Sequence, residues 1–357
     1  MKSYDVCIVG AGPAGMLLAY LLAKKEISTL LIERTNTIAK TFRGEHINEE
    51  GEEVLKKHDL FEAIEAYGLL KMQTLEYWQN GEIIKHIDAD PTVGHLSIHV
   101  PQANLLKAIL DKAKELPHFH YTLETRVVDL LHNEENICCG VTTLKNGEYE
   151  DIYAKLVVGA DGRFSTVRKL AKIDIEKRKH GYDLLWARIP APKDWSPSIK
   201  MALIDGNQIS IFSQFNGYIQ IGWNIEPGSF PTLRKQPFNV LTEKLTTAFP
   251  QLKESLSQHI TSWDDFILLD VFSTRTDNWG DNGVVLIGDA VHTMTPTGAF
   301  GLNSAMKDAD VLAQELNPQS FDLLSSTCKV KRKEEIERLQ ALQIEKELNF
   351  YKNFLNS

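Results

Sequence analysis

The residues best suited to chemistry lie in one stretch near the carboxyl end, residues 284–308. The stretch opens with four apolar residues, Val284 to Ile287, which predict a strand buried on both faces. Gly288 and Asp289 follow directly. A carboxylate at the end of such a strand is well placed to accept hydrogen bonds from the hydroxyl groups of a sugar. The alternative is an ordinary strand–loop–helix connection.

The loop that follows contains Pro296, Gly298 and Gly301. Glycines let the backbone approach a flat ligand closely. Asn303 is a predicted cap for a helix that begins near Ser304. A helix N-terminus stabilises an anion, including a reduced and negatively charged ring. Asp289 and the N-terminus of this helix are therefore predicted to lie at the same ligand site.

The amino end carries the other half of a nucleotide site. Tyr4–Val9 predicts a strand, the sequence GAGPAG follows at residues 10–15, and a helical pattern comes next. A second strand, Thr29–Ile32, ends at Glu33. This order is the dinucleotide fingerprint in its proper context.

Each residue of the fingerprint has a physical role. Gly10 makes the turn, Gly12 lets the backbone reach a pyrophosphate, and Gly15 allows close packing of helix on strand. Glu33 is placed to hold the adenosine ribose, the alternative being a solvated charge at a strand end. We therefore expect a bound dinucleotide.

Three more polar residues are candidates for the same ligand. Arg43 could pair with the pyrophosphate, or be a solvated loop arginine. Gln102 begins a predicted helix and could face the cofactor, or be a plain helix-start residue. Asp161 ends a buried strand, where open α/β sheets bind ligands, or it caps the next helix.

Composition limits the function classes. The chain has 357 residues, 43% of them hydrophobic, which suits about two domains. A net charge of −9 argues against bulk attraction to nucleic acid, and no apolar run is long enough to span a membrane. The four cysteines lack CxxC spacing, so a metal site or disulfide is not expected, and a reducing cytoplasm is the predicted compartment.

The remaining patterns predict mostly strands. Asn80-Gly81 marks a hairpin, and an antiparallel sheet is expected from about residue 178 onwards. Phe238–Ile260 predicts one amphipathic helix, Phe266–Phe272 a strand, and Lys329–Phe354 a long helix packed across the body or bound to a membrane surface or partner.

Three separated motifs stand in one order: GAGPAG with Glu33 and Arg34, the segment Val158–Gly162, and Gly288-Asp289 with its loop. Over about residues 4–315 they resemble the single-component FAD-dependent aromatic hydroxylases, the para-hydroxybenzoate hydroxylase type. The loop from Pro296 to Asn303 is especially similar to the flavin loop of that family.

The resemblance implies non-covalent FAD, and NAD(P)H as a transient co-substrate because no second GxGxxG is present. In this family Asp289 would hold the ribityl chain, and Asp161 would serve both FAD and the pyridine nucleotide. Motifs and resemblance together predict these cofactor-binding residues: Gly10, Gly12, Ala14, Gly15, Glu33, Arg34, Arg43, Gln102, Asp161, Gly288, Asp289, Pro296, Gly301, Leu302 and Asn303.

The chemistry that the resemblance implies belongs to the cofactor. NAD(P)H reduces FAD, O2 adds to give a flavin C(4a)-hydroperoxide, and its distal oxygen attacks an electron-rich ring. The protein must exclude water and hold the ring beside the flavin. No side chain has to be a nucleophile, so no certain catalytic residue is assigned. Pro296, Gly298 and Gly301 would shape the oxygen site.

The predicted substrate is an uncharged aromatic or polycyclic small molecule. Where the resembling enzyme has an arginine that binds a substrate carboxylate, this chain has Phe215, and Arg275 is the residue that could replace that arginine. The sheet that faces the flavin is expected to present an aromatic lining. Its predicted substrate-binding residues are Phe212 or Ser213, Phe215, Tyr218, Trp223 and Arg275.

Two other function classes stay open. One is a different flavin enzyme on the same fold: a halogenase, a desaturating enzyme or an isoprenoid reductase. Halogenases of this fold carry a WxWxIP segment, which residues 222–227 only half resemble. The other is a non-redox binding protein, as Rab GDP-dissociation inhibitors are on a related fold.

The predicted fold class is α/β, with a Rossmann-like FAD-binding domain of the glutathione-reductase type, an antiparallel substrate-binding sheet and a C-terminal helix. We expect a monomer or homodimer. The predicted boundaries are 1–73, 100–177 and 269–325 for the FAD-binding domain, 74–99 and 178–268 for the sheet domain, and 326–357 for the helix.

Overall fold

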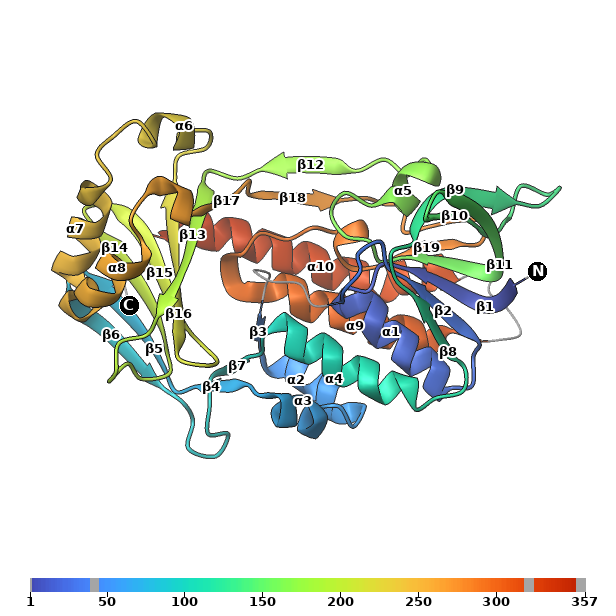
Figure 1. Ribbon diagram of the computed structural model, residues 1–357, viewed down its shortest axis with the longest axis horizontal. Helices are drawn as coiled ribbons and strands as arrows, with labels where there is room; N and C mark the ends of the chain where they lie inside the picture. Colours follow the sequence, from blue (N-terminus) through green and yellow to red (C-terminus); the bar gives the residue numbers. More distant parts are fainter. Residues whose placement is uncertain (1, 39–44, 318–323, 351–357) are drawn as a thin grey trace. The chain divides into compact units, whose positions relative to one another are not determined.

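The computed structural model describes residues 2–38, 45–317 and 324–350 (Figure 1). The chain divides into two compact units. Unit 1 consists of Met1–Tyr67, Gln102–Arg178 and Ser273–Gln343, and unit 2 of Gly68–Pro101, Lys179–Phe272 and Ile344–Ser357.

Unit 1 is built on a seven-stranded sheet in the order β8-β2-β1-β11-β10-β9, with β19 paired to β11. The strands β8, β2, β1, β11 and β19 run parallel, whereas β9, β10 and β11 form an antiparallel meander. The bounds are β1 (Lys2–Val9), β2 (Thr29–Ile32), β8 (Phe119–Thr122), β9 (Arg126–His132), β10 (Cys138–Lys145), β11 (Glu148–Gly159) and β19 (Val284–Leu286).

One helix organises the packing of unit 1. Helix α1 (Pro13–Lys24) is buried at every position from Ala14 to Ala23, because its sequence is apolar on all sides. It packs on β1 and β2 and contacts both α4 (Gln102–Lys114) and α9 (Phe300–Glu315) (Figure 1). The other helices and short strands of this part of the chain are β3 (His46–Ile47), α2 (Glu49–Lys57), α3 (Phe61–Tyr67), α5 (Thr166–Leu170), β12 (Glu176–Lys179), β18 (Phe272–Arg275) and α10 (Leu324–Leu348).

Unit 2 contains a second seven-stranded sheet, in the order β17-β13-β16-β15-β14-β5-β6. The pair β14–β5 is parallel and the other pairs are antiparallel. The predicted hairpin is confirmed, since Asn80 and Gly81 both have positive φ between β5 and β6. The strands are β5 (Thr74–Gln79), β6 (Glu82–Asp88), β13 (Asp183–Pro190), β14 (Ser198–Ile204), β15 (Asn207–Gln214), β16 (Tyr218–Ile225) and β17 (Ile267–Leu269). Outside this sheet, β4 (Leu70–Met72) pairs antiparallel with β7 (Ser97–His99).

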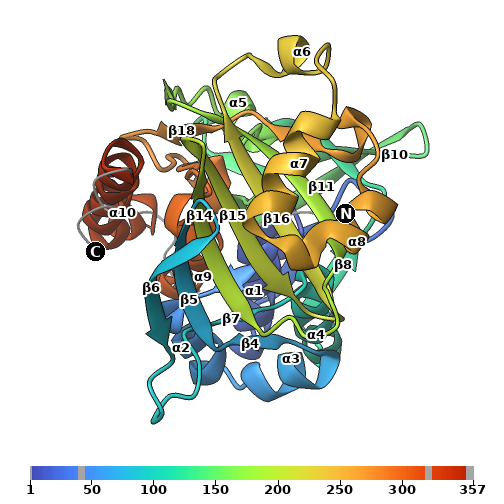
Figure 2. The same ribbon diagram turned by 90° about the vertical axis from the view of Figure 1, so that its left-hand side faces the viewer.

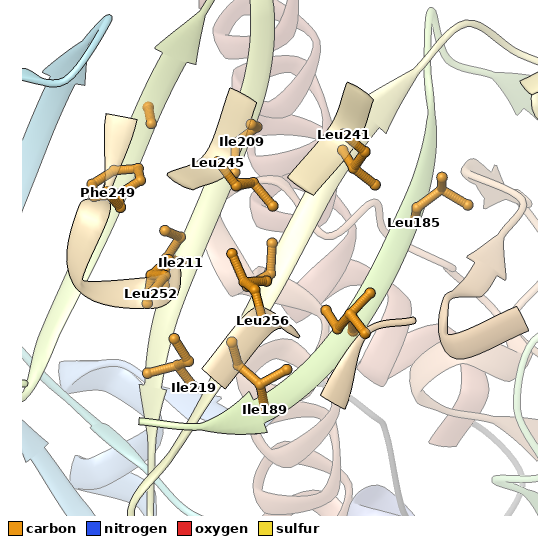
Figure 3. Packing of buried hydrophobic residues seen from close by; sticks show 14 of the residues in the cluster. Leu185, Ile189, Ile209, Ile211, Ile219, Leu241, Leu245, Phe249, Leu252 and Leu256 are labelled. Carbon is orange, nitrogen blue, oxygen red and sulfur yellow. The ribbon is translucent and has the colours of Figure 1, made fainter. Parts of the chain in front are cut away.

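Helices cover one face of this sheet. Figure 2 shows α7 (Asn239–Ala248) and α8 (Lys253–His259) against β15 and β16, and a single-turn helix, α6 (Phe230–Leu233), precedes them. Figure 3 shows the apolar contacts, in which Leu245 of α7 and Phe249, the residue after α7, lie over strand residues such as Ile209 and Ile211. Alternate residues of each strand point to this core, so the intervening residues point to the opposite face.

Two predicted elements are corrected. Phe238–Ile260 is two helices, because Pro250 begins a separate turn, Pro250–Leu252, between α7 and α8. Phe266–Phe272 is also interrupted, since β17 pairs with β13 whereas β18 pairs with β12. The predicted long C-terminal helix is confirmed as α10, and among the described residues no helix has the length and apolar character that crossing a membrane requires.

The core of unit 2 gives a stability prediction. Leu245→Ala should destabilise the protein by about 2–5 kcal/mol, because Leu245 has no exposed surface and its loss leaves a cavity. Val240→Ala on the same helix should cost less than about 0.5 kcal/mol, because Val240 is 47% exposed. Urea unfolding measures both, and equal losses would show that α7 does not pack as described.

Candidate functional site

The turn between β1 and α1 requires glycine at two positions. Gly10 has φ +105°, and a Cβ there would lie 2.5 Å from the carbonyl oxygen of Ala160 at the end of β11. A Cβ on Gly15 would lie 2.0 Å from the carbonyl oxygen of Gly10. The two strands and the helix therefore approach one another as closely as the fingerprint predicts.

Gly12 differs from both of these glycines. Among the residues that the structure describes, no atom lies within 4 Å of a Cβ built on it and no side chain caps the N-terminus of α1, where Pro13 is the first residue. Backbone N–H groups at an uncapped helix N-terminus bind phosphate oxygens well. The space beside Gly12 is thus a cradle in which a pyrophosphate fits.

Glu33 is fixed by hydrogen bonds and is only 3% exposed, so it is not a solvated charge. Its Oε2 accepts from the N–H of Ala11 at 2.9 Å, and its Oε1 accepts from the N–H and hydroxyl of Thr35. The carboxylate is therefore held beside the cradle. Its contact with a ribose stays a prediction. Arg34 is exposed, and Arg43 lies outside the described residues.

Asp161 caps a helix, which was the alternative interpretation of this residue. Its Oδ2 accepts from the N–H of Thr166 at 2.6 Å and of Val167 at 3.2 Å, and its Oδ1 accepts from the Ser165 hydroxyl. A cap and a cofactor contact do not exclude each other, and the cofactor contact stays a prediction.

A buried ion cluster holds the Gly288-Asp289 turn. Asp308 of α9 accepts the N–H of Gly288 at 2.9 Å through Oδ2, which also lies 2.6 Å from Nε2 of His292. Its Oδ1 accepts from Nε of Arg332 on α10 at 2.9 Å. Asp308, His292 and Arg332 are each at most 3% exposed. The turn that carries Asp289 is therefore anchored to two helices.

The charge of Asp308 depends on its partners. Burial alone would raise the pKa of this carboxyl, but His292 and Arg332 lower it to about 2. The carboxylate is consequently ionised at neutral pH, and it neutralises the buried guanidinium of Arg332.

The loop before α9 uses two left-handed residues in sequence, Gly298 with φ +77° and Ala299 with φ +55°. They let the helix begin at Phe300, where no side chain of a described residue caps it. The predicted cap at Asn303 is therefore wrong, because Asn303 lies inside the first turn. Leu302 lies in the same turn, and Pro296 and Gly301 are partly exposed.

Asn303 instead ties α9 to the segment before α2. Its amide donates to the carbonyls of Ala299 at 2.8 Å and His46 at 3.3 Å, and its Oδ1 accepts from the N–H of Asn48. Gly51 lets α2 approach, since a Cβ there would lie 2.1 Å from that Oδ1. In the same segment before α2, the carboxylate of Glu45 accepts the N–H of Gln102, the first residue of α4.

Two predicted substrate residues lie on the side of the unit 2 sheet that α7 and α8 cover. Trp223 is in register with Ile209 and packs against the core under α7 and α8. Ser213 is in register with Ile219 of that core, and its hydroxyl accepts from the N–H of Ser198. Trp223 and Ser213 therefore lie on the covered face, whereas Phe212, the alternative to Ser213, points to the opposite face, and contact with a substrate stays a prediction.

The other substrate candidates lie in different surroundings. The ring of Phe215 packs against Gly68, where an added Cβ would be 2.1 Å away. Tyr218 is 37% exposed and lies under the guanidinium of Arg188. Arg275 donates to Glu176 at 2.7 Å and is largely exposed, so its charge already has a partner.

Known proteins agree with this geometry. A family model described as an FAD binding domain matches residues 3–319. The chain belongs to this FAD-binding family. The match confirms the FAD cofactor, the α/β fold class and the resemblance to FAD-dependent aromatic hydroxylases, and the protein is an oxidoreductase.

Individual relatives span most of the chain. It is 29% identical over 348 residues to 6-methylpretetramide 4-monooxygenase of Streptomyces rimosus, covering 95% of this chain and 82% of that protein. It is 26% identical over 334 residues to digeranylgeranylglycerophospholipid reductase of Methanosarcina acetivorans, covering 90% of this chain and 76% of that protein. The crystal structure of PqsL from Pseudomonas aeruginosa shares the fold over the whole of both chains, with a TM-score of 0.85 at 18% identity.

The glycine cradle yields a first site prediction. Gly12→Val should weaken FAD binding by about 100-fold or more, because the side chain displaces the pyrophosphate from charge-assisted hydrogen bonds worth roughly 1.5–3 kcal/mol each. The melting temperature of the FAD-free protein should not change, since nothing lies within 4 Å of the new Cβ. Fluorescence titration with FAD and thermal melting measure the two effects.

Gly15→Val is the matched control, since its Cβ would meet the Gly10 carbonyl and should lower the melting temperature itself. An FAD affinity of the Gly12→Val protein equal to that of the wild type would contradict the prediction that the pyrophosphate binds beside Gly12.

The ion cluster yields a second prediction. Asp308→Asn should lower the free energy of unfolding by about 1–3 kcal/mol at pH 7, because Arg332 loses the more deeply buried of its two carboxylate partners and keeps only Glu335. The folded pKa of about 2 lies below the unfolded value of about 3.9, so the carboxylate stabilises the fold above pH 4 and this stabilisation is lost as pH falls toward 2. The free energy of unfolding of the wild type should therefore exceed that of the variant by about 1 kcal/mol less at pH 3 than at pH 5.

Urea unfolding at pH 5 and pH 3 measures this difference. Asp174→Asn, at an exposed position, is the control and should change the free energy of unfolding at neither pH. A difference that stays constant with pH would contradict the ionised cluster.

Proposed function

We propose that this FAD-dependent monooxygenase uses NAD(P)H and O2 to hydroxylate an uncharged aromatic or polycyclic small molecule. One oxygen atom enters the ring as a hydroxyl group, and the other leaves as water with the hydride of NAD(P)H and a proton. The supporting observation is that the cradle at Gly12 and the loop before α9 occur in one family-matched unit.

Bound FAD supplies the redox chemistry, since it accepts the hydride and activates O2. The chain's own residues bind and orient it. Gly12 and the N-terminus of α1 would hold the pyrophosphate, Glu33 the ribose and Asp289 the ribityl chain. The uncapped N-terminus of α9 would stabilise negative charge on the reduced ring. Pro296, Gly298 and Gly301 would line the place where oxygen reacts.

The nature of the substrate follows from the sheet face opposite α7 and α8. Along β14, β15 and β16 the positions on this face carry no charge: Ile199, Met201, Leu203, Gln208, Ser210, Phe212, Gln214, Tyr218, Gln220, Gly222 and Asn224. Gln214 and Gln220 are buried there and bond each other at 2.6 Å. On β13 the same face carries one cation, the exposed Arg188, whose guanidinium lies over the ring of Tyr218. A carboxylate placed away from Arg188 would have no cationic partner and is disfavoured, which favours a neutral ring.

A second candidate is reduction of an isoprenoid double bond, which the similarity to the archaeal reductase supports. The two candidates differ in the mass of their product. A hydroxylase adds one oxygen atom, whereas a reductase adds two hydrogen atoms and leaves O2 unused.

The substrate prediction is tested with a panel of rings. Neutral phenols, naphthols and quinolones should stimulate NAD(P)H oxidation, with apparent affinities at least about tenfold tighter than those of hydroxybenzoates, a difference of about 1.4 kcal/mol. Product mass and peroxide release complete the measurement. Tight, coupled turnover of a hydroxybenzoate with no response to neutral rings would contradict the prediction.

Phe212 offers matched variants for this panel, because its side chain lies on the face in question. Phe212→Leu should keep the preference for neutral rings, Phe212→Asp should weaken binding of all rings, and Phe212→Lys should shift the preference toward hydroxybenzoates. FAD content should be equal in all three, because Phe212 lies in unit 2 and the cradle lies in unit 1. An unchanged preference in all three would show that substrate does not bind this face.

A further inference from the structure

The segment from Val291 to Thr295 is buried but irregular. It lies outside the strands and α-helices, between the single turns Gly288–Ala290 and Thr297–Ala299. Thr293, Met294 and Thr295 are each at most 6% exposed. Buried backbone N–H and C=O groups need hydrogen-bond partners, and an irregular segment cannot supply them from a ladder of its own.

Thr274 of β18 bonds the backbone of Thr293, and helix α10 supplies further partners through side-chain amides. Oε1 of Gln343 accepts from the N–H of Thr295 at 3.3 Å, and its Nε2 donates to the carbonyls of Thr295 at 2.8 Å and Thr297 at 2.6 Å. Nε2 of Gln340 donates to the carbonyl of Thr293 at 3.2 Å. Gln343 has no exposed surface. One amide therefore holds the backbone on both sides of Pro296.

Gln343 and the Asp308 cluster act at opposite ends of the segment. Asp308 fixes its beginning through the N–H of Gly288, whereas Gln343 fixes its end. Pro296 has no N–H of its own, so its position depends on the residues on either side of it. The left-handed residues Gly298 and Ala299 and the start of α9 follow directly.

We propose that Gln343 is a positioning residue for oxygen transfer: it sets the backbone around Pro296 and thereby the place of the flavin ring and of the oxygen site. This inference rests on the proposed function, which puts the flavin ring beside Pro296 and Gly298. Displacing a reacting group by about 1 Å can slow a reaction about 100-fold. The amide of Gln343 fixes the backbone on both sides of Pro296, and this backbone in turn fixes the position of the flavin ring.

The first test is Gln343→Leu, which keeps the size of the side chain and removes its hydrogen bonds. The visible circular dichroism of bound FAD, without substrate, should change, and hydroxylated product per NAD(P)H consumed should fall about tenfold or more. FAD affinity should change less than about threefold, because the cradle at Gly12 is untouched. Arg338→Leu, at an exposed position on the same helix, should behave as wild type.

The second test is Gln343→Glu, measured from pH 6 to pH 9. A protonated carboxyl can donate to one carbonyl and accept from the N–H of Thr295, but an ionised carboxylate cannot donate. Burial raises the pKa of such a group into this range. The flavin circular dichroism of this variant should therefore resemble wild type at pH 6 and differ at pH 9, while wild type does not change.

These readouts separate the two proposals. If Gln343→Leu does not fold, the pH titration of Gln343→Glu decides alone. Flavin circular dichroism equal to wild type in every Gln343 variant and at every pH would overturn the positioning role. A Gln343-dependent signal in a protein that hydroxylates no ring would keep the positioning of the flavin and overturn the proposed function.

Discussion

The buried carboxylate of Asp308 is the interaction on which much of unit 1 depends. It joins the Gly288 turn, His292 and the C-terminal helix through Arg332, all away from solvent. An isolated charge at this depth would be prohibitively costly, so each partner is needed by the others. The cluster makes α10 part of the cofactor-binding unit instead of a tail.

The two ends of the cofactor site are built by different means. At the amino end, glycines let backbone meet backbone, and the described residues leave space beside Gly12 at the N-terminus of α1, which none of their side chains caps. At the carboxyl end, the backbone is irregular and buried, and side chains from α9 and α10 satisfy it. The first end depends on the absence of a side chain, and the second depends on particular polar side chains.

The sequence predicted what local rules determine. GAGPAG, the Asn80-Gly81 hairpin and the strand ends at Glu33 and Asp289 follow from turn geometry and spacing. The break at Pro250 could have been read from the proline itself. The sheet face could have been read from the alternation of Ile209, Ile211, Ile219 and Ile221, which puts Ser213 and Trp223 on the covered side.

The features that the sequence could not predict depend on contacts between residues that are far apart in the chain. The early start of α9 depends on a left-handed Ala299, which no sequence rule requires. Asp308, Arg332 and Gln343 look like ordinary polar helix residues until the fold brings α10 against residues 288–297. Because their partners are backbone groups or single charges far along the chain, no local pattern marks them.

The fate of molecular oxygen is the most direct measure of whether the protein transfers oxygen to a ring. With a ring that stimulates NAD(P)H oxidation, turnover under 18O2 should give a product that carries one 18O atom, and turnover in H218O under ordinary O2 should give an unlabelled product. A product without 18O from O2, or one that gains only two hydrogen atoms, would contradict a monooxygenase.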